Sequence, residues 1–262
     1  MQPLELYIHI PFCVKKCAYC DFLSGPAGEK EKEEYVKMLV DEIRNCPDTV
    51  QNYRVISIFF GGGTPSLLTG EQIGRLMDTV REIFTLDEDA EITMEMNPGT
   101  VTEEKLRKYR QAGVNRLSIG LQSVNDEELR LLGRIHTYEE FREAYHLARA
   151  NGFSNINVDL ISAIPGQTVE SWRRTLEQVM ALSPEHISAY SLILEEGTTF
   201  YKKYVEDEAK EGPKLPDEDA ERQMYWDTET LMEKNRYHRY EISNYAKEGY
   251  ACRHNLGYWE RI

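Results

Sequence analysis

Three cysteines near the start of the chain have a spacing that suits metal chemistry. Cys13, Cys17 and Cys20 follow an apolar segment in the pattern C-x3-C-x2-C. Three thiolates in one tight loop suit a [4Fe–4S] cluster whose fourth iron is open to another ligand. Lys15 and Lys16, inside the loop, add positive charge that favours thiolates and a negatively charged cluster.

Two other interpretations of these cysteines are a partial zinc site and three unrelated core residues. A structural zinc ion prefers four protein ligands, usually as two pairs, so the spacing favours the cluster. The chain has five cysteines, and an odd number with three clustered fits a reducing compartment better than a disulfide framework.

A glycine run and several polar residues are candidates for ligand binding. Glycines after a strand let a ligand approach the backbone, whose N–H and C=O groups can bond an ammonium or carboxylate group. Taken singly, each polar residue is equally consistent with a surface or structural role, but a shared position at the strand ends favours binding. The candidates are Gly61, Gly62, Gly63, Thr64, Glu95, Gln122, Arg134 and Asp159.

The elements that position these residues alternate between strand and helix. Helical periodicity is predicted over about 31–45, 73–84, 102–112, 138–151 and 168–182. Six such alternations predict a parallel sheet with right-handed crossovers, and candidates at the carboxyl ends of its strands favour a partly open barrel. The predicted strands are Leu4–Ile10, Val55–Phe60, Glu91–Met96, Arg116–Leu121, Asn155–Ile161 and His186–Leu194.

The last quarter of the chain has a different character. Residues 206–222 carry two prolines among many acids and are predicted to form an exposed linker. A helix is expected over about 218–235, followed by the sequence CRHNLGYW at 252–259. We therefore predict a core barrel over 1–205, an acidic linker over 206–222 and a short α-helical C-terminal region over 223–262.

Charge and hydropathy restrict the partners and the compartment. A net charge of −14 argues against nucleic acid as a main partner, because phosphate binding needs a positive surface. The chain has no apolar run near the roughly 20 residues that span a bilayer, and its start does not resemble a signal peptide. These features predict a cytoplasmic protein without a transmembrane segment.

With these motifs, the chain resembles the oxygen-independent coproporphyrinogen III oxidase-like family of radical S-adenosylmethionine (SAM) proteins. The resemblance implies a partial (β/α)6 barrel, a [4Fe–4S] cluster on the three cysteines and SAM on the open iron. It also implies SAM binding by the candidates above together with Tyr7 and Tyr19, with Arg134 as a partner for the SAM carboxylate. The matching segments are YIHIPFCVKKCAYCDF (7–22), GGGTPSLL (61–68), GVNRLSIGLQS (113–123), LGRIH (132–136) and NINVDLISAIPGQT (155–168).

Two branches of this family differ just after the cysteine loop. The coproporphyrinogen dehydrogenases carry another cysteine two residues after the third ligand, where this chain has Phe22. The CDF ending and the HNxxYW motif that begins at His254 resemble the HemW heme chaperones instead. This implies binding of heme and its transfer to acceptor proteins, with His254 as the candidate heme ligand and Cys252 as an alternative.

The resemblance leaves a second function open, because the barrel motifs are shared by both branches. In that case the chain is an oxygen-independent coproporphyrinogen III oxidase, which forms protoporphyrinogen IX through a SAM-derived radical. Whether the chain is an enzyme therefore stays open. A reductase or flavodoxin-type electron donor is a possible partner in either case.

The chain departs from the family pattern in two places. Relatives usually continue for about another hundred residues, so a truncated product or fragment is expected. The sequence Ser162–Pro165 also replaces the more usual Tyr-Gly-Leu-Pro, a change expected to affect packing alone.

Overall fold

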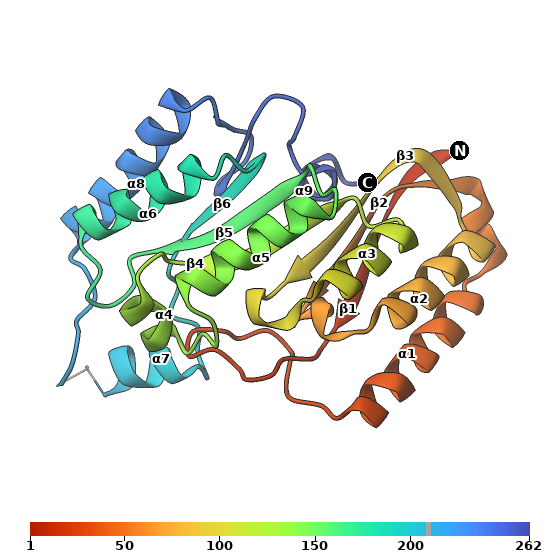
Figure 1. The fold of residues 1–262 in the computed structure, drawn as a ribbon, viewed down its shortest axis with the longest axis horizontal. Helices are drawn as coiled ribbons and strands as arrows, with labels where there is room; N and C mark the ends of the chain where they lie inside the picture. The colour runs from red at the N-terminus through yellow and green to blue at the C-terminus, as the bar shows by residue number, and fades with distance from the viewer. Residues whose placement is uncertain (208–210) are drawn as a thin grey trace.

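Parallel strands form the centre of the fold in this computed structural model, which describes residues 1–207 and 211–262 (Figure 1). Strands β1 to β6 pair in chain order, and β8 and β7 extend the same sheet with antiparallel pairing. Because β1 and β7 lie at the two ends of this order, the sheet is an open arc. The strands are β1 Gln2–Ile10, β2 Tyr53–Gly62, β3 Thr85–Met96, β4 Arg116–Gln122, β5 Ile156–Ser162, β6 His186–Ser191, β7 His238–Arg239 and β8 Asn244–Ala246.

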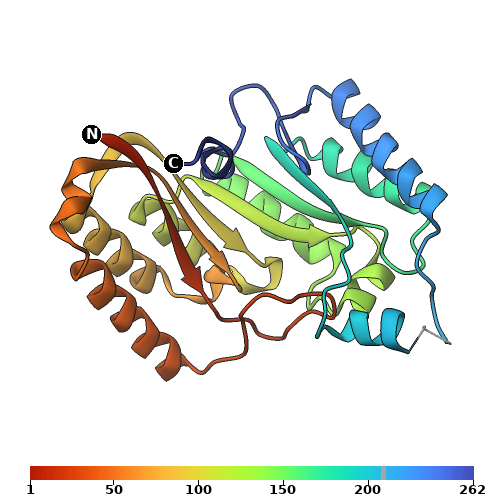
Figure 2. The same cartoon turned by 180° about the vertical axis from the view of Figure 1, so that it is seen from behind.

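The longer helices cover one face of this sheet, as Figures 1 and 2 show from opposite sides. Helix α2 packs on both α1 and α3, and α8 packs on α6. Single turns of 3-10 helix lie at Asp48–Asn52, Pro65–Leu67 and Pro98–Thr100, and a π-helical turn at Lys202–Glu206. The α-helices are α1 Glu29–Arg44, α2 Gly70–Ile83, α3 Glu103–Ala112, α4 Asp126–Leu132, α5 Tyr138–Ala150, α6 Val169–Ala181, α7 Thr199–Tyr201, α8 Glu218–Lys234 and α9 Arg253–Glu260.

Side-chain caps fix where several helices start. At the start of α2, Thr69 Oγ1 accepts the Gln72 N–H at 3.2 Å, and Gln72 Oε1 accepts the Thr69 N–H at 2.9 Å. Thr137 and Glu140 form the same reciprocal pair at the start of α5, which follows α4. Each cap satisfies backbone donors that the first helical turn leaves free, and so fixes the residue at which the helix begins.

The strands have one apolar face and one polar face. Because successive side chains alternate across a strand, the helix-facing positions are buried and apolar, among them Ile58, Phe60, Met94, Leu117, Ile119 and Val158. The opposite, inner face carries the buried polar residues Ser57, Thr93, Ser118, Asn157 and Ser188. A buried polar group without a hydrogen bond costs about 1–3 kcal/mol, so this inner face requires partners.

The C-terminal segments are part of the same core as the strands. Trp172 of α6 is fully buried and donates from Nε1 to Thr228 Oγ1 of α8 at 2.9 Å. Met224 and Met232 of α8 belong to the core cluster that contains the strand residues. Helix α9 packs against β2 and lies in front of the sheet in Figure 2, on its inner face.

The predicted parallel sheet and its helices are confirmed, with differences in detail. Strand β6 ends at Ser191 and not at Leu194, because Leu192 and Leu194 instead pack on an apolar cluster around Leu132 and Phe200. The C-terminal extension contains strands β7 and β8 as well as helix. Helix α4, α9 and these two strands were not predicted, since short elements held by tertiary contacts carry little periodic signal.

The predicted domain boundaries stay a prediction, and the described segments bear on two of them. Helix α8 begins at Glu218, inside the predicted linker over 206–222, so the last part of that range is helical. Residues 208–210 of the predicted linker lie outside the described residues. The region over 223–262 contributes β8 to the sheet of the core barrel.

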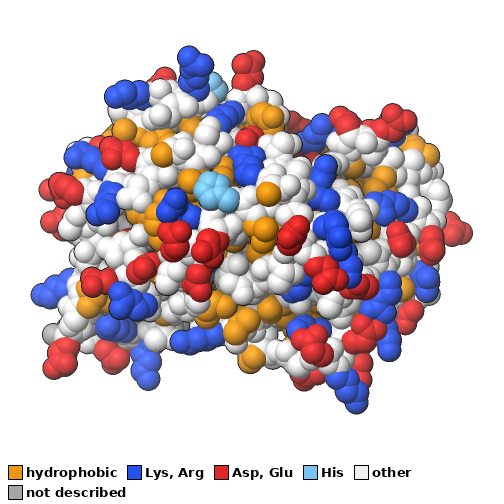
Figure 3. Space-filling view, in the orientation of Figure 1, with side chains coloured by type: hydrophobic (Ala, Val, Ile, Leu, Met, Phe, Trp, Pro, Cys, Tyr) orange, Lys and Arg blue, Asp and Glu red, His pale blue; other side chains and the backbone are white. Residues whose placement is uncertain are grey.

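Acidic and basic side chains are interspersed over the helical face of the molecule (Figure 3). Examples of exposed ion pairs are Arg75–Glu33 at 2.6 Å and Arg142–Glu139 at 2.9 Å. Such pairs contribute roughly 0–1 kcal/mol each, so the core and its buried polar groups decide stability. Within residues 1–207 and 211–262, no helix has the length and apolar character needed to cross a membrane.

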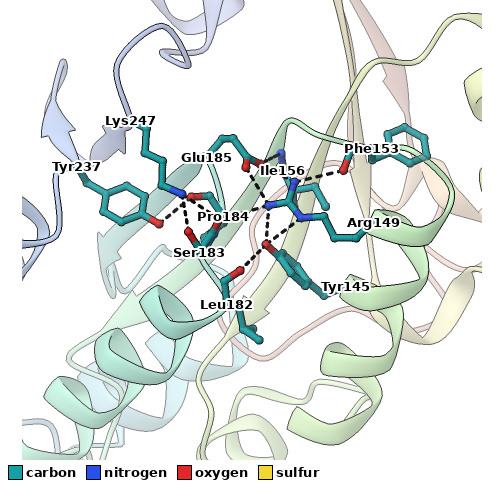
Figure 4. A network of polar contacts seen from close by, with 10 residues as sticks. All are labelled: Tyr145, Arg149, Phe153, Ile156, Leu182, Ser183, Pro184, Glu185, Tyr237 and Lys247. Carbon is teal, nitrogen blue, oxygen red and sulfur yellow. Dashed lines mark hydrogen bonds and ion pairs between the residues drawn. The ribbon is translucent and has the colours of Figure 1, made fainter.

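An ion pair at the amino ends of β5 and β6 joins four segments (Figure 4). Arg149 of α5 contacts Glu185 with an Nη1–Oε2 distance of 2.8 Å. The Glu185 carboxylate also accepts the Ile156 N–H at 3.0 Å, where β5 begins. The Arg149 guanidinium donates further to Tyr145 Oη at 2.6 Å and to the Phe153 carbonyl at 3.2 Å. One guanidinium therefore fixes the end of α5 and the starts of β5 and β6.

The same network reaches the C-terminal strands. Tyr237 Oη donates to the Pro184 carbonyl at 2.7 Å, and Lys247 Nζ donates to the Ser183 carbonyl at 3.0 Å. These bonds hold the segments around β7 and β8 against the loop before β6 (Figure 4).

We expect Arg149→Met to lower the free energy of unfolding by roughly 2–4 kcal/mol, because Glu185 then stays largely buried without its cation. Urea denaturation followed by circular dichroism measures this change. Arg142→Met removes an exposed pair with Glu139 and is expected to change the same quantity by less than about 0.5 kcal/mol. Equal effects of the two substitutions would contradict the role given to the network.

Candidate cofactor site

The three cysteines lie on a loop that is tied both to β1 and to distant parts of the chain. A bridge closes the loop at its base, where the Cys13 N–H donates to the Gly25 carbonyl at 2.9 Å. In the middle of the loop, the Ala18 N–H donates to the Leu132 carbonyl at 2.9 Å. The Ala18 carbonyl accepts the Phe200 N–H, also at 2.9 Å. The loop is therefore held from three sides and not by its own sequence alone.

The segment that follows α4 brings a cation to the cysteines. Gly133 has φ +79°, in the left-handed region that favours glycine, and this turn packs directly against the backbone of Ala18. Arg134 then places Nη1 3.8 Å from Cys17 Sγ and donates from Nη2 to the Gly120 carbonyl at 2.6 Å. Its buried Nε has no hydrogen-bond partner among the described residues. A guanidinium at this position favours thiolates.

The thiols themselves are partly buried, and none of the five cysteines forms a disulfide in the described structure. Thr64 Oγ1 lies 3.5 Å from Cys13 Sγ. Burial raises the pKa of the Cys20 thiol, while Lys16 and the backbone of Phe22 lower it by less. The lysines of the loop were expected to favour thiolates, and for Cys20 the effect of burial is larger. A bound metal would supply the missing stabilisation.

A cavity of about 410 Å³ lies between this loop and the carboxyl ends of the strands. Ser191 and Tyr190 of β6 form part of its wall. The structure brings most of the predicted site residues to this cavity: Cys13, Cys17, Tyr19, Cys20, Gly62, Gly63, Thr64, Glu95, Gln122, Arg134 and Asp159. This volume is within the range of small-molecule and cofactor sites.

Two glycines of the run have conformations or contacts that a side chain would prevent. Gly62 has φ +107°, and its N–H donates to Glu95 Oε2 at 3.0 Å. A Cβ on Gly63 would lie 2.6 Å from the Phe12 carbonyl oxygen, so this strand end can pack directly against the start of the cysteine loop. The run therefore joins β2 to the loop and leaves its backbone open toward the cavity.

Two carboxyl groups, which belong to Glu95 and Asp159, lie at the cavity wall. Burial and the nearby Asp159 charge raise the pKa of Glu95 to about 8, against one hydrogen bond from the Gly62 N–H that lowers it. Burial also raises the pKa of Asp159, although bonds from Ser118 and Asn157 and the charge of Arg116 lower it. Two acids that resist ionisation in one cavity make it favourable for a ligand that carries positive charge or donates hydrogen bonds.

Gln122 ends β4 with an unusual backbone conformation. Its φ is +77°, in the left-handed region that residues other than glycine rarely adopt. Its side chain is buried at the cavity wall, one residue beyond Leu121. Such strain persists where surrounding structure determines it, and it is common at binding sites.

Three of the predicted site residues lie outside the lining of this cavity. Tyr7 and Gly61 lie just beside it, where a Cβ on Gly61 would approach the rings of Phe59 and Tyr7 to about 3.0 Å. His254 of α9 lies on the inner face, stacked on Phe59 with the ring centroids 5.2 Å apart. Only 4% of His254 is exposed, and Nδ1 bonds Ser57 Oγ at 2.9 Å. The structure therefore does not bring His254 to the cysteines, and heme ligation by His254 stays a prediction.

Sequence reasoning missed several residues that line the cavity. Ser118 and Gly120 face it from β4, and the alternation of Ser118, Gly120 and Gln122 along one strand face was a usable signal. Phe22 and Ile193 also line it while 60% and 67% exposed, so two apolar side chains lie at its edge. No sequence signal identifies Ile193, because its position depends on the chain leaving the sheet after β6.

The residues present fit the cofactors that the cysteine motif implies. Three unpaired thiols on one loop leave a fourth position of a [4Fe–4S] cluster free, and Arg134 supplies a cation beside them. The orphaned Nε of Arg134 and the carboxylates of Glu95 and Asp159 provide a donor and acceptors for an amino acid and a ribose. The described cavity thus suits a zwitterionic, hydroxyl-bearing ligand next to the cluster loop.

Comparisons with known proteins agree with this fit. Residues 7–179 match the family model of the Radical SAM superfamily. The chain is 44% identical over 260 residues to heme chaperone HemW of Escherichia coli (strain K12), covering 99% of this chain and 67% of that protein. It is 39% identical over 254 residues to heme chaperone HemW of Bacillus subtilis (strain 168), covering 97% and 66%. The chain therefore spans about two thirds of the length of these relatives.

A solved structure supports the fold assignment. Coproporphyrinogen III oxidase (HemN) from Escherichia coli, a radical SAM enzyme, matches with a TM-score of 0.85 and 30% identity. The match covers 99% of this chain and 58% of that one.

We expect Glu95→Gln to stabilise the cofactor-free protein increasingly as pH rises from 5 to 8. A carboxyl with a raised folded pKa contributes stability below its unfolded value near 4.5, and this is lost as pH rises through the folded pKa of about 8. Glutamine never ionises, so the difference in unfolding free energy should grow by roughly 3–5 kcal/mol and then level off. Urea denaturation at several pH values measures it; a difference independent of pH would contradict the assignment.

Proposed function

We propose a function for this chain, which belongs to the radical SAM superfamily and to its branch of HemW heme chaperones. It binds a [4Fe–4S] cluster, SAM and heme, and it passes heme to acceptor proteins. One observation carries this proposal. The cysteine loop, the glycine run and the polar strand ends converge on one cavity, in a chain similar to HemW proteins along nearly its whole length.

In this proposal Cys13, Cys17 and Cys20 hold the cluster, and the remaining cavity residues hold SAM. When bound, the cluster supplies electrons and an open iron site, which the amino acid part of SAM occupies. Arg134 pairs with a carboxylate, a role suited to its guanidinium fork. The backbone of Gly62 and Gly63 contacts the same part of the ligand. Glu95, Gln122 and Asp159 accept hydrogen bonds from its ammonium group and from its ribose hydroxyls, with Tyr7 and Tyr19 alongside.

Heme binding by His254 requires a change in the position of α9. In the described conformation the His254 ring lies inside the barrel, and burial lowers its pKa to about 4, so the imidazole is neutral. A neutral imidazole is the form that ligates iron, but this ring is covered. We propose that α9 leaves the inner face when His254 takes heme. The neighbouring Tyr258 and Trp259, which are exposed, then offer aromatic surface for the macrocycle.

The compartment and the protein partners are part of the same proposal. Three thiols that must stay reduced suit the cytoplasm. Heme acceptor proteins are the expected partners, together with a flavodoxin-type electron donor if the cluster turns over. The division into a core barrel, a linker and a C-terminal region is likewise proposed, with α8 assigned to the C-terminal region.

The alternative function is that of a coproporphyrinogen III oxidase. The structural likeness to HemN favours it, since the whole described fold matches that enzyme. Phe22 argues against the oxidase function, because coproporphyrinogen dehydrogenases carry a cysteine at this position. Identity to the HemW relatives is also higher, at 39–44%, than the 30% to HemN.

Anaerobically reconstituted protein is expected to bind heme with a shifted Soret band and to leave coproporphyrinogen III unchanged. Both measurements are made on the same sample, by absorbance titration and by chromatography of the tetrapyrrole after incubation with SAM and reductant. Formation of protoporphyrinogen IX at rates above a cluster-free control would replace the chaperone assignment with the enzyme.

We expect each of the substitutions Cys13→Ala, Cys17→Ala and Cys20→Ala to abolish the brown chromophore near 400 nm. The cluster needs a thiolate on each of the three irons that SAM does not bind, and the two remaining thiolates cannot hold it. Iron and sulfide content per chain, measured after anaerobic reconstitution, tests this. Cys46→Ala is the matched control and is expected to retain the cluster. Full iron content in any of the first three variants would refute that ligand.

A further inference from the structure

A chain of hydrogen bonds crosses the inner face from the cofactor cavity to α9. At the α9 end, Asn255 Nδ2 donates to Tyr240 Oη at 3.2 Å. Tyr240 Oη lies 2.8 Å from His186 Nε2, and His186 Nδ1 lies 2.6 Å from Asn157 Oδ1. Asn157 Nδ2 then donates to Asp159 Oδ1 at 2.8 Å. Asp159 lines the cavity, so the chain has one end at the cofactor site and the other on α9.

Each bond in this hydrogen-bond chain has a fixed direction when Asp159 carries its charge. The ionised carboxylate only accepts, so the amide nitrogen of Asn157 faces Asp159 and its oxygen faces His186. His186 therefore carries its proton on Nδ1, and its Nε2 accepts from the Tyr240 hydroxyl. The oxygen of Tyr240 is left to accept from Asn255. In such a chain each group that donates becomes a better acceptor, so the bonds strengthen one another.

The chain adds to a small set of contacts that dock α9 and cover His254. Tyr240 Oη also accepts the Cys252 N–H at 3.3 Å, at the start of the helix. Cys252 Sγ lies 3.2 Å from Glu91 Oε1, and His254 Nδ1 lies 2.9 Å from Ser57 Oγ. Its other nitrogen, Nε2, is buried without a partner among the described residues, which costs free energy in the docked state. Tyr240 is therefore one of the residues that hold the start of α9 against the inner face.

We propose that ligand binding in the cofactor cavity and docking of α9 are coupled through this hydrogen-bond chain, so that an occupied cavity keeps His254 covered and an empty cavity allows α9 to leave. The inference rests on the proposed function in one respect, that SAM is the cavity ligand. Its direction follows from charge. A sulfonium, an ammonium or a hydroxyl donor next to Asp159 favours the anionic carboxylate, and bonds to an anion are about twice as strong as neutral ones.

Coupling of this kind is reciprocal. If SAM strengthens α9 docking by a given factor, then whatever draws α9 and His254 away from the barrel weakens SAM binding by the same factor. Heme capture through His254 and retention of SAM would therefore oppose each other. This makes His186 and Tyr240 positioning residues, because they act on the ligand through Asp159 and do not line the cavity.

Alkylation of Cys252 measures the docking of α9 directly. This thiol is fully buried beneath the helix and becomes accessible only when α9 moves. Cluster-loaded protein is treated anaerobically with iodoacetamide, and mass spectrometry of its peptides gives the rate at Cys252. We expect saturating SAM to slow this rate by about 10-fold in the wild-type protein and by less than about 2-fold in Tyr240→Phe.

Tyr237→Phe is the matched control for this variant. It also removes one buried tyrosine hydroxyl, which donates a hydrogen bond of 2.7 Å to the Pro184 carbonyl. Tyr237 does not belong to the hydrogen-bond chain between Asp159 and Asn255. The SAM effect should persist at about 10-fold in this control. The Tm of each variant identifies labelling that occurs through global unfolding. Equal SAM effects in Tyr240→Phe and Tyr237→Phe would overturn the proposal.

A second variant, Asp159→Asn, tests the coupling without SAM. Asp159→Asn places a neutral amide where two donors, Asn157 Nδ2 and Ser118 Oγ, require acceptors, so the chain loses its anionic end. We expect alkylation of Cys252 to accelerate several-fold in this variant, and an unchanged rate would overturn the coupling. Equilibrium dialysis tests SAM binding separately. If the wild-type protein fails to bind SAM, the proposed cofactor is wrong, and the Asp159→Asn arm still decides the coupling.

Discussion

The need to satisfy buried polar groups on the inner face of the sheet determines much of this structure. Apolar residues on the opposite strand face pack against helices without directional requirements, whereas serines, asparagines and a histidine on the inner face require specific partners. Some of those partners come from the C-terminal segment, where Tyr240 bonds His186 and α9 bonds Ser57 and Glu91. The C-terminal region is therefore required by the chemistry of the strands that precede it.

The same polar face creates the electrostatic character of the cavity. Glu95 and Asp159 line the cavity with raised pKa values, and the cationic Arg134 lines it next to the Cys17 thiol. A ligand that carries a carboxylate can pair it with Arg134, and positive charge on the same ligand can pair with the two acids. Such a ligand compensates the cation and the two carboxylates at once. The protein without a ligand is thus electrostatically incomplete in a way that selects for zwitterions.

Features that depend on interactions between neighbouring residues were predictable from the sequence, and features that depend on distant contacts were not. The parallel strands and their helices were predicted because periodicity is encoded in neighbouring residues. Most of the predicted site residues lie at one cavity because the carboxyl ends of parallel strands meet at one edge. The position of His254 was not predicted, since its burial depends on contacts with Ser57, distant in the chain. The early end of β6 likewise depends on where Leu192 and Leu194 find an apolar cluster.

The tethers of the cysteine loop have a consequence for synthesis of the protein. The loop bonds the Leu132 carbonyl and the Phe200 amide, which are synthesised well after the cysteines. Until residue 200 has emerged from the ribosome, the loop lacks the contacts that hold it against the strand ends. The nascent chain therefore carries three thiols without their final contacts while more than 170 further residues are added.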